Sequence, residues 1–460
     1  MTGDGGEKRR PAGRLIMPRT IGDVLKVADE LKQKRDWLKA LKIHRLVMEA
    51  APYDGEVRLD IASAFMALGF EEPAAATYME TCRHCARAGY PLQSIVAAKK
   101  YAQMKGGADE MFTFIAGLYG AEAESKGKTS RISPIDKEIP VKDDVNLDYP
   151  IDVKDLVQST LQLVLAASKT APYPETLPPL PILTDLPSEL FVRLINEVAL
   201  RTAPPGSIVI REGEEATNFF MIARGRVTIY KGEGPNRRIE LARLGEGSVF
   251  GEMALITQSP RTATVEAGQD TELLDFGKEK LDTLVEDSVV IEAALERFTR
   301  ERLISNLLAT NPIFQPFDRK QRYQLLARFT AHEVTPGTVL VREGQIGRGL
   351  YIILYGQAEV TKQEDGKSVL VGTLKSGDIF GEISLIKDSQ TTASVAATSH
   401  CTILFLPKEY FQKLTESIGD LREYFDELSA RRLTMTEKAI QKARELDEEA
   451  IVLEDELIMI

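Results

Sequence analysis

The sequence predicts a multidomain chain, in which an α-helical repeat-like N-terminal domain precedes two antiparallel β-barrel or jelly-roll domains with flanking helices. Three observations predict this class. Apolar residues recur at helical spacing through residues 20–120. Nine of the 22 prolines lie between Pro134 and Pro187, which indicates a linker at residues 121–180. After the linker, short glycine-bounded strand patterns occur twice, about 130 residues apart.

Composition limits the possible function classes. A chain of 460 residues is too long to fold around a single hydrophobic core, so we expect several domains. Its net charge of −11 disfavours a nucleic-acid-binding protein. No apolar run reaches 18 residues and residues 1–19 have no apolar core, so we expect no membrane span, no signal peptide and a disordered N-terminal tail. The three cysteines cannot form a disulfide framework, which favours a reducing, cytoplasmic setting.

The helical N-terminal domain resembles tetratricopeptide repeats in one respect. Ala40 and Ala74 lie 34 residues apart, and a bulky residue follows each of them after four positions, at His44 and Tyr78. Two interpretations remain: the helices form a groove for a protein partner, or they form a bundle that caps the rest of the chain. Thr20 and Asp23 form a capping box that starts a first predicted helix, and further predicted helices span residues 37–50, 57–68, 73–88, 91–104 and 109–119.

Two further features of this half of the chain have simple interpretations. The linker contains one apolar helix at residues 153–167, which we expect to pack on a neighbouring element, with proline-rich flanks that we expect to act as semi-rigid spacers. Cys82 and Cys85 form a CxxC motif inside a predicted helix. Because no second ligand pair lies nearby, we expect neither a metal site nor redox chemistry there.

The second half of the chain is a duplication. Three segments recur at an offset of 130 or 131 residues, and ten of the 18 residues that start at Phe250 are identical in the 18 that start at Phe380. The predicted domains cover residues 181–308 (domain A) and 309–418 (domain B), and helical patterns at 187–200, 278–308 and 318–329 flank them. In domain A we expect strands at residues 207–210, 227–230, 239–244, 264–267 and 272–276.

The repeated segment FGEMALITQSPRTATV, which starts at Phe250, has the residues of an anion site. A glycine followed by a short helical turn directs backbone N–H groups at an anion. Arg261, nine residues after Glu252, can pair with a phosphate through two N–H groups. The carboxylate of Glu252 repels a phosphate but can accept a hydrogen bond from a hydroxyl group.

This segment closely resembles the phosphate-binding cassette of the cyclic nucleotide-binding domain. That family includes regulatory subunits of cyclic-nucleotide-dependent kinases, gated channels and catabolite-activator transcription factors. The resemblance implies that Glu252 binds the ribose 2′-OH and Arg261 the cyclic phosphate of cAMP or cGMP. It also implies ligand contacts from the remaining cassette positions, which are Gly251, Met253, Ala254, Thr262 and Ala263. The alternative is an empty turn in which Glu252 and Arg261 pair with each other.

The second copy departs from the family pattern. Gly381 and Glu382 are retained, but Thr391 stands at the arginine position, followed by Thr392. A hydroxyl group has no charge to offer a phosphate, so domain B is a degenerate site that is either empty or specific for another ligand.

Residues 419–460 contain 12 acidic and six basic residues with an apolar helical stripe, which predicts a C-terminal docking or self-association helix. A basic recognition helix for DNA is missing from the sequence, and no nucleophile or metal constellation indicates an enzyme. The sequence therefore predicts a cyclic-mononucleotide receptor that signals to a protein partner through the helical domain or the C-terminal helix. A homo-oligomer is compatible with this interpretation. The alternative is a scaffold protein that works without nucleotide.

Overall fold

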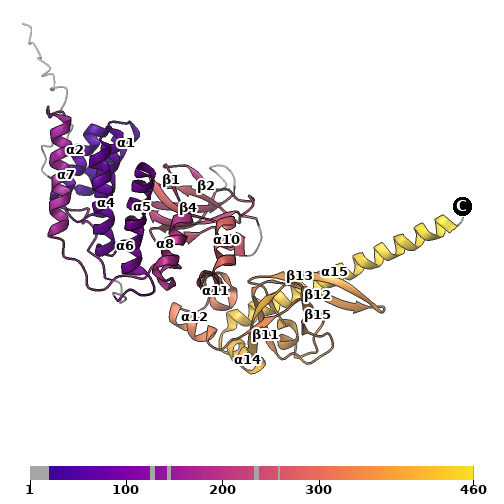
Figure 1. The fold of residues 1–460 in the computed structure, drawn as a ribbon. Coiled ribbons are helices and arrows are strands. Elements are labelled where there is room, and N and C mark those ends of the chain that lie inside the picture. Colours follow the sequence, from indigo (N-terminus) through magenta and orange to yellow (C-terminus); the bar gives the residue numbers. More distant parts are fainter. Residues whose placement is uncertain (1–19, 125–129, 142–146, 233–237, 257–259, 459–460) are drawn as a thin grey trace, which may run out of the picture. The chain divides into compact units, whose positions relative to one another are not determined.

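The computed structural model describes residues 20–124, 130–141, 147–232, 238–256 and 260–458 (Figure 1). The predicted disordered tail lies outside these residues. The chain divides into two compact units, residues 1–296 and 297–460, and each is described here by itself. The first contains the helical domain, the linker and domain A, and the second contains domain B and the C-terminal helix.

Six helices form the helical domain, as predicted. Side chains of Thr20, Asp36 and Asp54 accept hydrogen bonds from backbone N–H groups at three of the helix starts. Gly89 and Gly106 end two helices in the left-handed conformation that favours glycine. The loops are short, so consecutive helices pack against one another. The helices are α1 (Ile21–Gln33), α2 (Trp37–Ala50), α3 (Gly55–Ala67), α4 (Glu71–Ala88), α5 (Pro91–Lys105) and α6 (Asp109–Tyr119).

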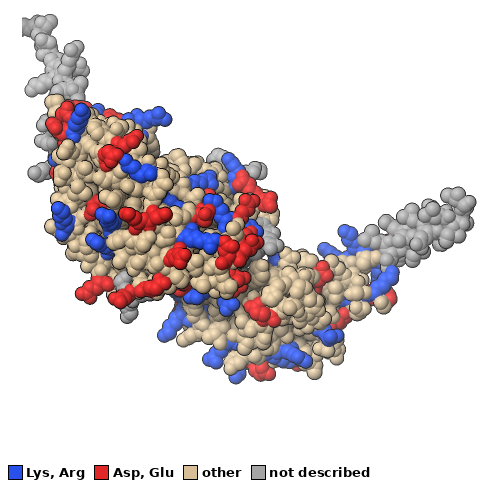
Figure 2. All heavy atoms as spheres, in the orientation of Figure 1, with Lys and Arg blue, Asp and Glu red and all other residues tan. Residues whose placement is uncertain are grey.

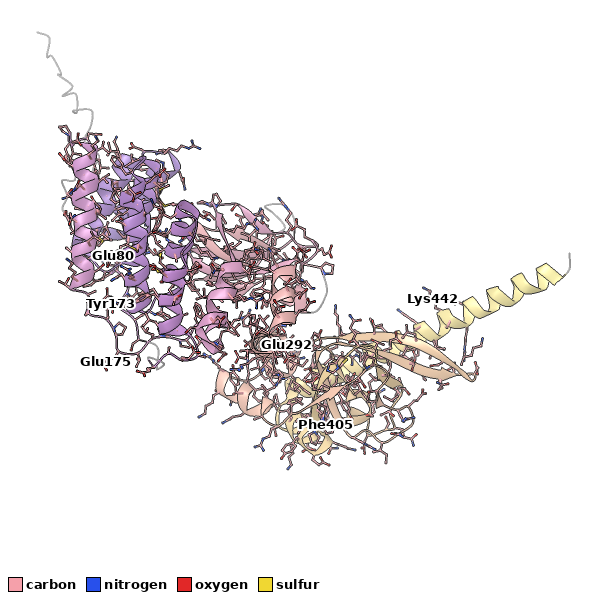
Figure 3. All side chains as sticks on the ribbon, viewed as in Figure 1. Glu80, Tyr173, Glu175, Glu292, Phe405 and Lys442 are labelled. Atoms are coloured by element: carbon pink, nitrogen blue, oxygen red, sulfur yellow. The ribbon has the colours of Figure 1, made fainter. Side chains whose placement is uncertain are left out.

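The linker contributes a seventh helix, α7 (Val153–Lys169), that packs against α2 and α4. It buries an apolar face, and Arg58 donates from Nη1 to Ser168 Oγ at 2.8 Å. After α7, the hydroxyl of Tyr173 lies 3.0 Å from Nδ1 of His84 in α4 (Figure 3). Both the helix and its packing on a neighbouring element were predicted, but Tyr173 in the flank after α7 contacts the helical domain, so this flank is not a free spacer. Burial of the apolar face joins this part of the linker to the helical domain.

Domain A consists of two four-stranded antiparallel sheets with strand orders β1-β8-β3-β6 and β2-β7-β4-β5. The jelly-roll form of the prediction is confirmed; the described strands form open sheets, not a closed barrel. The strands are β1 (Ala199–Ala203), β2 (Ile208–Ile210), β3 (Asn218–Arg224), β4 (Arg226–Lys231), β5 (Ile239–Gly245), β6 (Val249–Phe250), β7 (Thr264–Ala267) and β8 (Thr271–Gly277). The flanking helices are η1 (Leu183–Asp185), α8 (Ser188–Glu197), α9 (Glu252–Ile256), α10 (Lys278–Asp287) and α11 (Val289–Thr310).

The structure corrects two predicted helix bounds. The helix expected at residues 187–200 ends at Glu197, because Ala199–Ala203 pairs with β8 as an edge strand. The helix expected at 278–308 is divided at Ser288, whose backbone is extended. Apolar residues from both sheets, including Phe220 and Leu273 from one and Val227 from the other, meet in one buried cluster. This cluster supports the strands that hold the candidate site.

Domain B repeats this arrangement, with sheet orders β14-β11-β16-β9 and β10-β15-β12-β13. Its strands are β9 (Thr330–Val334), β10 (Val339–Val341), β11 (Gly349–Tyr355), β12 (Gln357–Glu364), β13 (Lys367–Lys375), β14 (Ile379–Phe380), β15 (Ser394–Ala397) and β16 (Cys401–Pro407). Its helices are η2 (Pro312–Phe314), α12 (Arg319–Leu326), α13 (Glu382–Ile386), α14 (Lys408–Ser417) and α15 (Gly419–Ile458). The predicted C-terminal helix is α15, which packs on β13 and α13.

The surface and the cysteines add few constraints. Figure 2 shows basic and acidic side chains interspersed over the visible face of the first unit. None of the described helices has the length and hydropathy of a membrane span. Cys82 and Cys85 are buried free thiols, and burial raises the pKa of Cys82 to about 12, which disfavours the reactive thiolate. Among the described residues, no group of three His, Cys, Asp or Glu side chains is placed to hold a metal.

A buried histidine makes the stability of the helical domain depend on pH. His84 Nε2 lies 2.9 Å from the carbonyl oxygen of Tyr53, and burial, reinforced by Arg58, lowers the pKa of His84 to about 4. The unfolded chain binds the proton near pH 6.5, so this contribution is complete above that pH and falls as the pH drops toward 4. We expect His84 to make the free energy of unfolding about 2 kcal/mol lower at pH 5 than at pH 7.5.

Urea unfolding of wild type and His84→Gln at the two pH values measures this effect. The variant should lose part of the pH dependence, whereas His400→Gln, at an exposed histidine, should keep the wild-type dependence. Equal pH dependence in His84→Gln and wild type would contradict the assignment.

Candidate ligand-binding site

The repeated motif forms a tight turn between β6 and α9. Gly251 has a φ of +83°, in the left-handed region that side chains rarely adopt. A Cβ atom at this position would lie 2.8 Å from both Nη1 of Arg261 and Cδ1 of Ile210. Glycine is therefore required here for the arginine to approach the turn.

Arg261 is buried and held by main-chain and side-chain oxygens. Its Nη1 donates to the carbonyl oxygen of Gly251 at 2.5 Å, and its Nη2 donates to the carbonyl oxygen and Oδ1 of Asn218 at 2.7 and 2.9 Å. Burial lowers the pKa of Arg261, but a guanidinium remains charged in proteins. Within the described residues, these contacts use three of its five N–H groups. The other two are the donors that a bound anion requires.

A third residue completes the support of Arg261. Asn218, at the start of β3, donates from Nδ2 to Oδ1 of Asp275 in β8 at 2.8 Å. The amide of Asn218 can therefore present only its oxygen to Arg261. Arg261, Asn218 and Asp275 form a polar triad that fixes the guanidinium before any ligand arrives.

The structure brings most of the predicted site residues together. Glu252, Ala254 and Arg261 are buried, Met253 and Ala263 are partly buried, and Thr262 is exposed. Arg261 donates to Gly251 and Asn218, and the charge of Glu252 also acts on its guanidinium. The assignment of these residues to a ligand remains a prediction.

In domain B the turn is retained without the arginine. Gly381 has a φ of +87°, and its Cβ would lie 2.8 Å from the carbonyl oxygen of Gly349. Thr391 accepts at Oγ1 from the backbone N–H of Gln345 at 3.0 Å, and its hydroxyl can donate to the carbonyl oxygen of the same residue at 3.1 Å. Its hydrogen bonds serve the loop of the protein itself.

All three members of the polar triad are replaced in domain B. At the offset of the duplication, Arg261 corresponds to Thr391, Asn218 to Gly349 and Asp275 to Phe405. The backbone pairing agrees, because Asn218 opposes Gly277 and Gly349 opposes Pro407. Phe405, which Figure 3 labels, contacts Tyr351 at a ring-centroid distance of 5.0 Å. A Cβ on Gly349 would lie 2.5 Å from the Phe405 ring, so an apolar cluster has replaced the charged support.

Sequence reasoning missed Asn218 and Asp275, although the duplication contains the signal. In the second copy the arginine is replaced, and the asparagine and aspartate that support it in the first copy are replaced as well. A comparison of the two copies at every position, not only across the cassette, would have identified both residues.

The retained carboxylate of domain B has a partner on the C-terminal helix. Glu382 is 1% exposed, and Arg432 of α15 donates to its Oε1 at 2.8 Å and to the carbonyl oxygen of Ile379 at 2.6 Å. Burial raises the pKa of Glu382, and Arg432 opposes that rise. The pair fastens α15 over the domain B site.

This site is a largely apolar cavity of about 280 Å³. Its lining includes Glu382, Thr391, Thr392 and the α15 residues Arg432 and Met435. The only basic residue in the lining is Arg432, which already pairs with Glu382. A phosphate in this cavity would meet Arg432 only as the partner of Glu382; Arg342 and Arg348 line the adjoining cavity that shares Gly381, Ser384 and Thr391.

Comparison with known proteins identifies the class to which these two domains belong. The sequence model of the cyclic nucleotide-binding domain matches residues 200–288 and 331–417. The chain therefore contains two cyclic nucleotide-binding domains in tandem, after a helical domain formed by α1–α6.

The tandem domains are similar to regulatory subunits of protein kinase A. The chain is 30% identical to the cAMP-dependent protein kinase regulatory subunit of Yarrowia lipolytica over an aligned segment of 236 residues. This segment covers 51% of this chain and 59% of the relative. It is 30% identical to the subunit of Eremothecium gossypii, over 50% of this chain and 46% of the relative. The solved regulatory domain of Toxoplasma gondii PKA with cAMP is 24% identical over 54% of this chain and 92% of that chain, with a TM-score of 0.26. The chain thus spans roughly half of the length of these curated relatives.

The Glu382–Arg432 pair gives a prediction for the stability of domain B. Arg432→Met leaves the Glu382 carboxylate buried without its partner, so we expect unfolding of domain B to cost about 3 kcal/mol less. Urea unfolding followed by circular dichroism measures the change. The double variant Glu382→Leu/Arg432→Met should recover most of the loss, because it removes both charges. A single variant as stable as wild type would show that α15 does not depend on the pair.

Proposed function

We propose that the protein is a non-enzymatic receptor for a cyclic mononucleotide, which binds in domain A, at residues 181–308. In this proposal Arg261 pairs with the cyclic phosphate and Glu252 accepts from the ribose 2′-OH. Backbone N–H groups near Gly251, Ala254 and Ala263 complete the phosphate contacts. The observation that supports it most directly is the buried guanidinium of Arg261, which is held by three hydrogen bonds and has two further N–H groups that can donate to a phosphate.

We infer that domain B, residues 309–418, does not bind a cyclic mononucleotide. A phosphate needs a cation or several N–H donors when it leaves water. Thr391 offers a neutral hydroxyl that already bonds to its own loop, and Arg432 is paired with Glu382. Domain B then serves as a structural or signalling element, with α15 as its outward connection.

The relatives favour cAMP and a protein partner. They carry the name cAMP-dependent protein kinase regulatory subunit, which supports cAMP over cGMP and a kinase as the partner. The helical domain and α15 are the parts that we propose for partner binding or self-association, in a cytoplasmic setting. The alternative is a scaffold protein whose two domains work without nucleotide, and calorimetry separates the two proposals.

Isothermal titration of the full chain with cAMP, and separately with cGMP, tests the proposal. We expect one equivalent of nucleotide per chain. Arg261→Met should weaken binding by about 2–5 kcal/mol, or roughly 30- to 4,000-fold in Kd, because the phosphate loses its buried partner.

Two matched variants make this titration specific. Arg243→Met removes an equal charge from an exposed position on β5 of the same domain and should leave Kd nearly unchanged. Glu382→Gln should leave the stoichiometry at one. Wild-type affinity in Arg261→Met, or two equivalents bound, contradicts the proposal, and no binding of either nucleotide favours the scaffold.

A further inference from the structure

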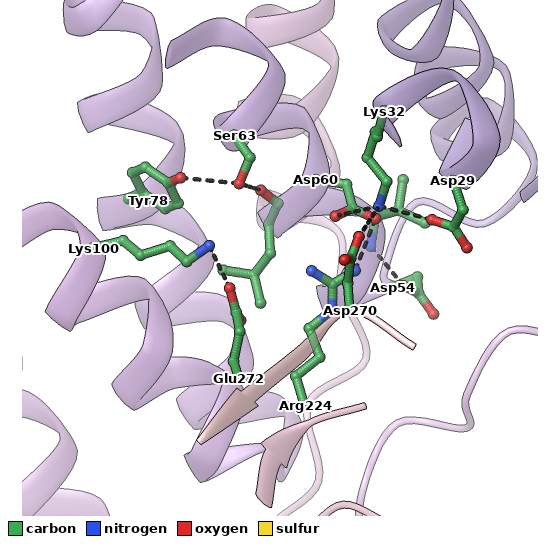
Figure 4. Close-up of polar contacts among 12 residues, drawn as sticks. Asp29, Lys32, Asp54, Asp60, Ser63, Tyr78, Lys100, Arg224, Asp270 and Glu272 are labelled. Atoms are coloured by element: carbon green, nitrogen blue, oxygen red, sulfur yellow. Dashed lines mark hydrogen bonds and ion pairs between the residues drawn. The ribbon is translucent and has the colours of Figure 1, made fainter. Parts of the chain in front are cut away.

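A network of ion pairs connects the helical domain to domain A (Figure 4). Arg224, at the end of β3, lies 2.8 Å from Asp60 of α3, and Lys32 of α1 lies 3.4 Å from the same carboxylate. Beside them, Lys100 of α5 pairs with Glu272 of β8. Arg224 and Glu272 oppose each other across the two strands, so adjacent strand positions present opposite charges to three helices.

These groups are withdrawn from water. The side chains of Asp60, Arg224 and Glu272 are 10%, 12% and 5% exposed. Burial alone would raise the pKa of Asp60, but Arg224 and Lys32 outweigh burial and hold that pKa far below its usual range. Because an unpaired charge is strongly disfavoured in such surroundings, these pairs stabilise the contact between the helical domain and domain A.

The two strands that receive the helical domain also hold the candidate site. Asn218, at one end of β3, binds Arg261, and Arg224, at the other end, binds the helical domain. In β8, Asp275 supports Asn218, and Glu272 pairs with Lys100. A β-bulge between Ile222 and Arg224 lies next to the helical-domain contact. A shift of β3 or β8 would therefore move both the candidate site and the contact with the helical domain.

Domain B supplies an internal comparison. It has the same bulge, between Ile353 and Tyr355, but Tyr355 stands where Arg224 does and Thr402 where Glu272 does. The copy that has lost the polar triad thus lacks both charges that contact the helical domain in domain A. Domain A has both the polar triad and the two charges that contact the helical domain, and domain B has neither.

We propose that the helical domain is the read-out element of the domain A site, linked to it through β3 and β8. This inference rests on the proposed nucleotide receptor and specifies how that receptor is regulated. The arrangement with the helical domain docked is the one in which Arg261 is held ready for an anion, so a ligand that binds this arrangement stabilises docking. By reciprocity, loosening the dock lowers the affinity for the ligand.

This linkage is tested by isothermal titration of cAMP into variants that lack an ion pair between the helical domain and domain A. Asp60→Asn preserves the shape of the side chain and removes the charge that pairs with Arg224 and Lys32. It should weaken cAMP binding by about five-fold or more, within the usual range for coupled sites. Lys105→Met is the matched control, because it breaks an exposed ion pair with Glu72 on the same domain and should leave Kd unchanged.

Hydrogen exchange of the wild-type chain with and without cAMP gives a second readout that does not depend on the folding of a variant. The linkage predicts slower exchange in α3 and α5 when cAMP is bound. If wild type binds cAMP but Asp60→Asn matches its Kd and exchange changes stay within the cassette and its sheets, the linkage is overturned and the receptor stands. If wild type binds neither cAMP nor cGMP, both proposals fail.

Discussion

A charge that leaves water must find a partner where it is buried, and this constraint determines how the first unit is built. Arg261 sits between the oxygens of Gly251 and Asn218, and Arg224 sits against Asp60. Both arginines depend on β3, one at each end. The strand therefore does more than contribute to the core: its ends determine the position of a candidate anion site and of a helical domain.

The duplication shows the same constraint in reverse. Domain B keeps the fold, the glycine turn and a buried glutamate, yet it replaces the arginine, its asparagine and its aspartate by Thr391, Gly349 and Phe405. Removing the arginine alone would leave polar groups without partners in a buried position, which costs stability. Their joint replacement gives a packed apolar cluster, and Glu382 is satisfied by Arg432 from the C-terminal helix.

Local patterns were sufficient to predict much of this architecture. Helical periodicity located the six helices of the N-terminal domain and α7, and β-branched alternation located most strands of domain A. The cassette was recognisable because its glycine, glutamate and arginine follow one another at fixed spacing. β1 was missed because its five residues become a strand only through pairing with β8.

Contacts between distant segments could not be predicted in the same way. Asp60 and Arg224 are 164 residues apart, and each alone resembles an ordinary surface charge in the sequence. The packing of α7 against α2 and α4 is a similar case, since an apolar helix face does not indicate its partner. Such contacts depend on the three-dimensional arrangement of the whole unit, which local sequence patterns do not encode.

A crystal structure of the full chain grown with cAMP tests the central claim most directly. The account predicts nucleotide in domain A alone, with a phosphate oxygen in hydrogen-bond contact with Arg261 and the Arg261–Asn218 and Arg224–Asp60 contacts retained. Nucleotide in domain B, or a phosphate in domain A that does not touch Arg261, would contradict it.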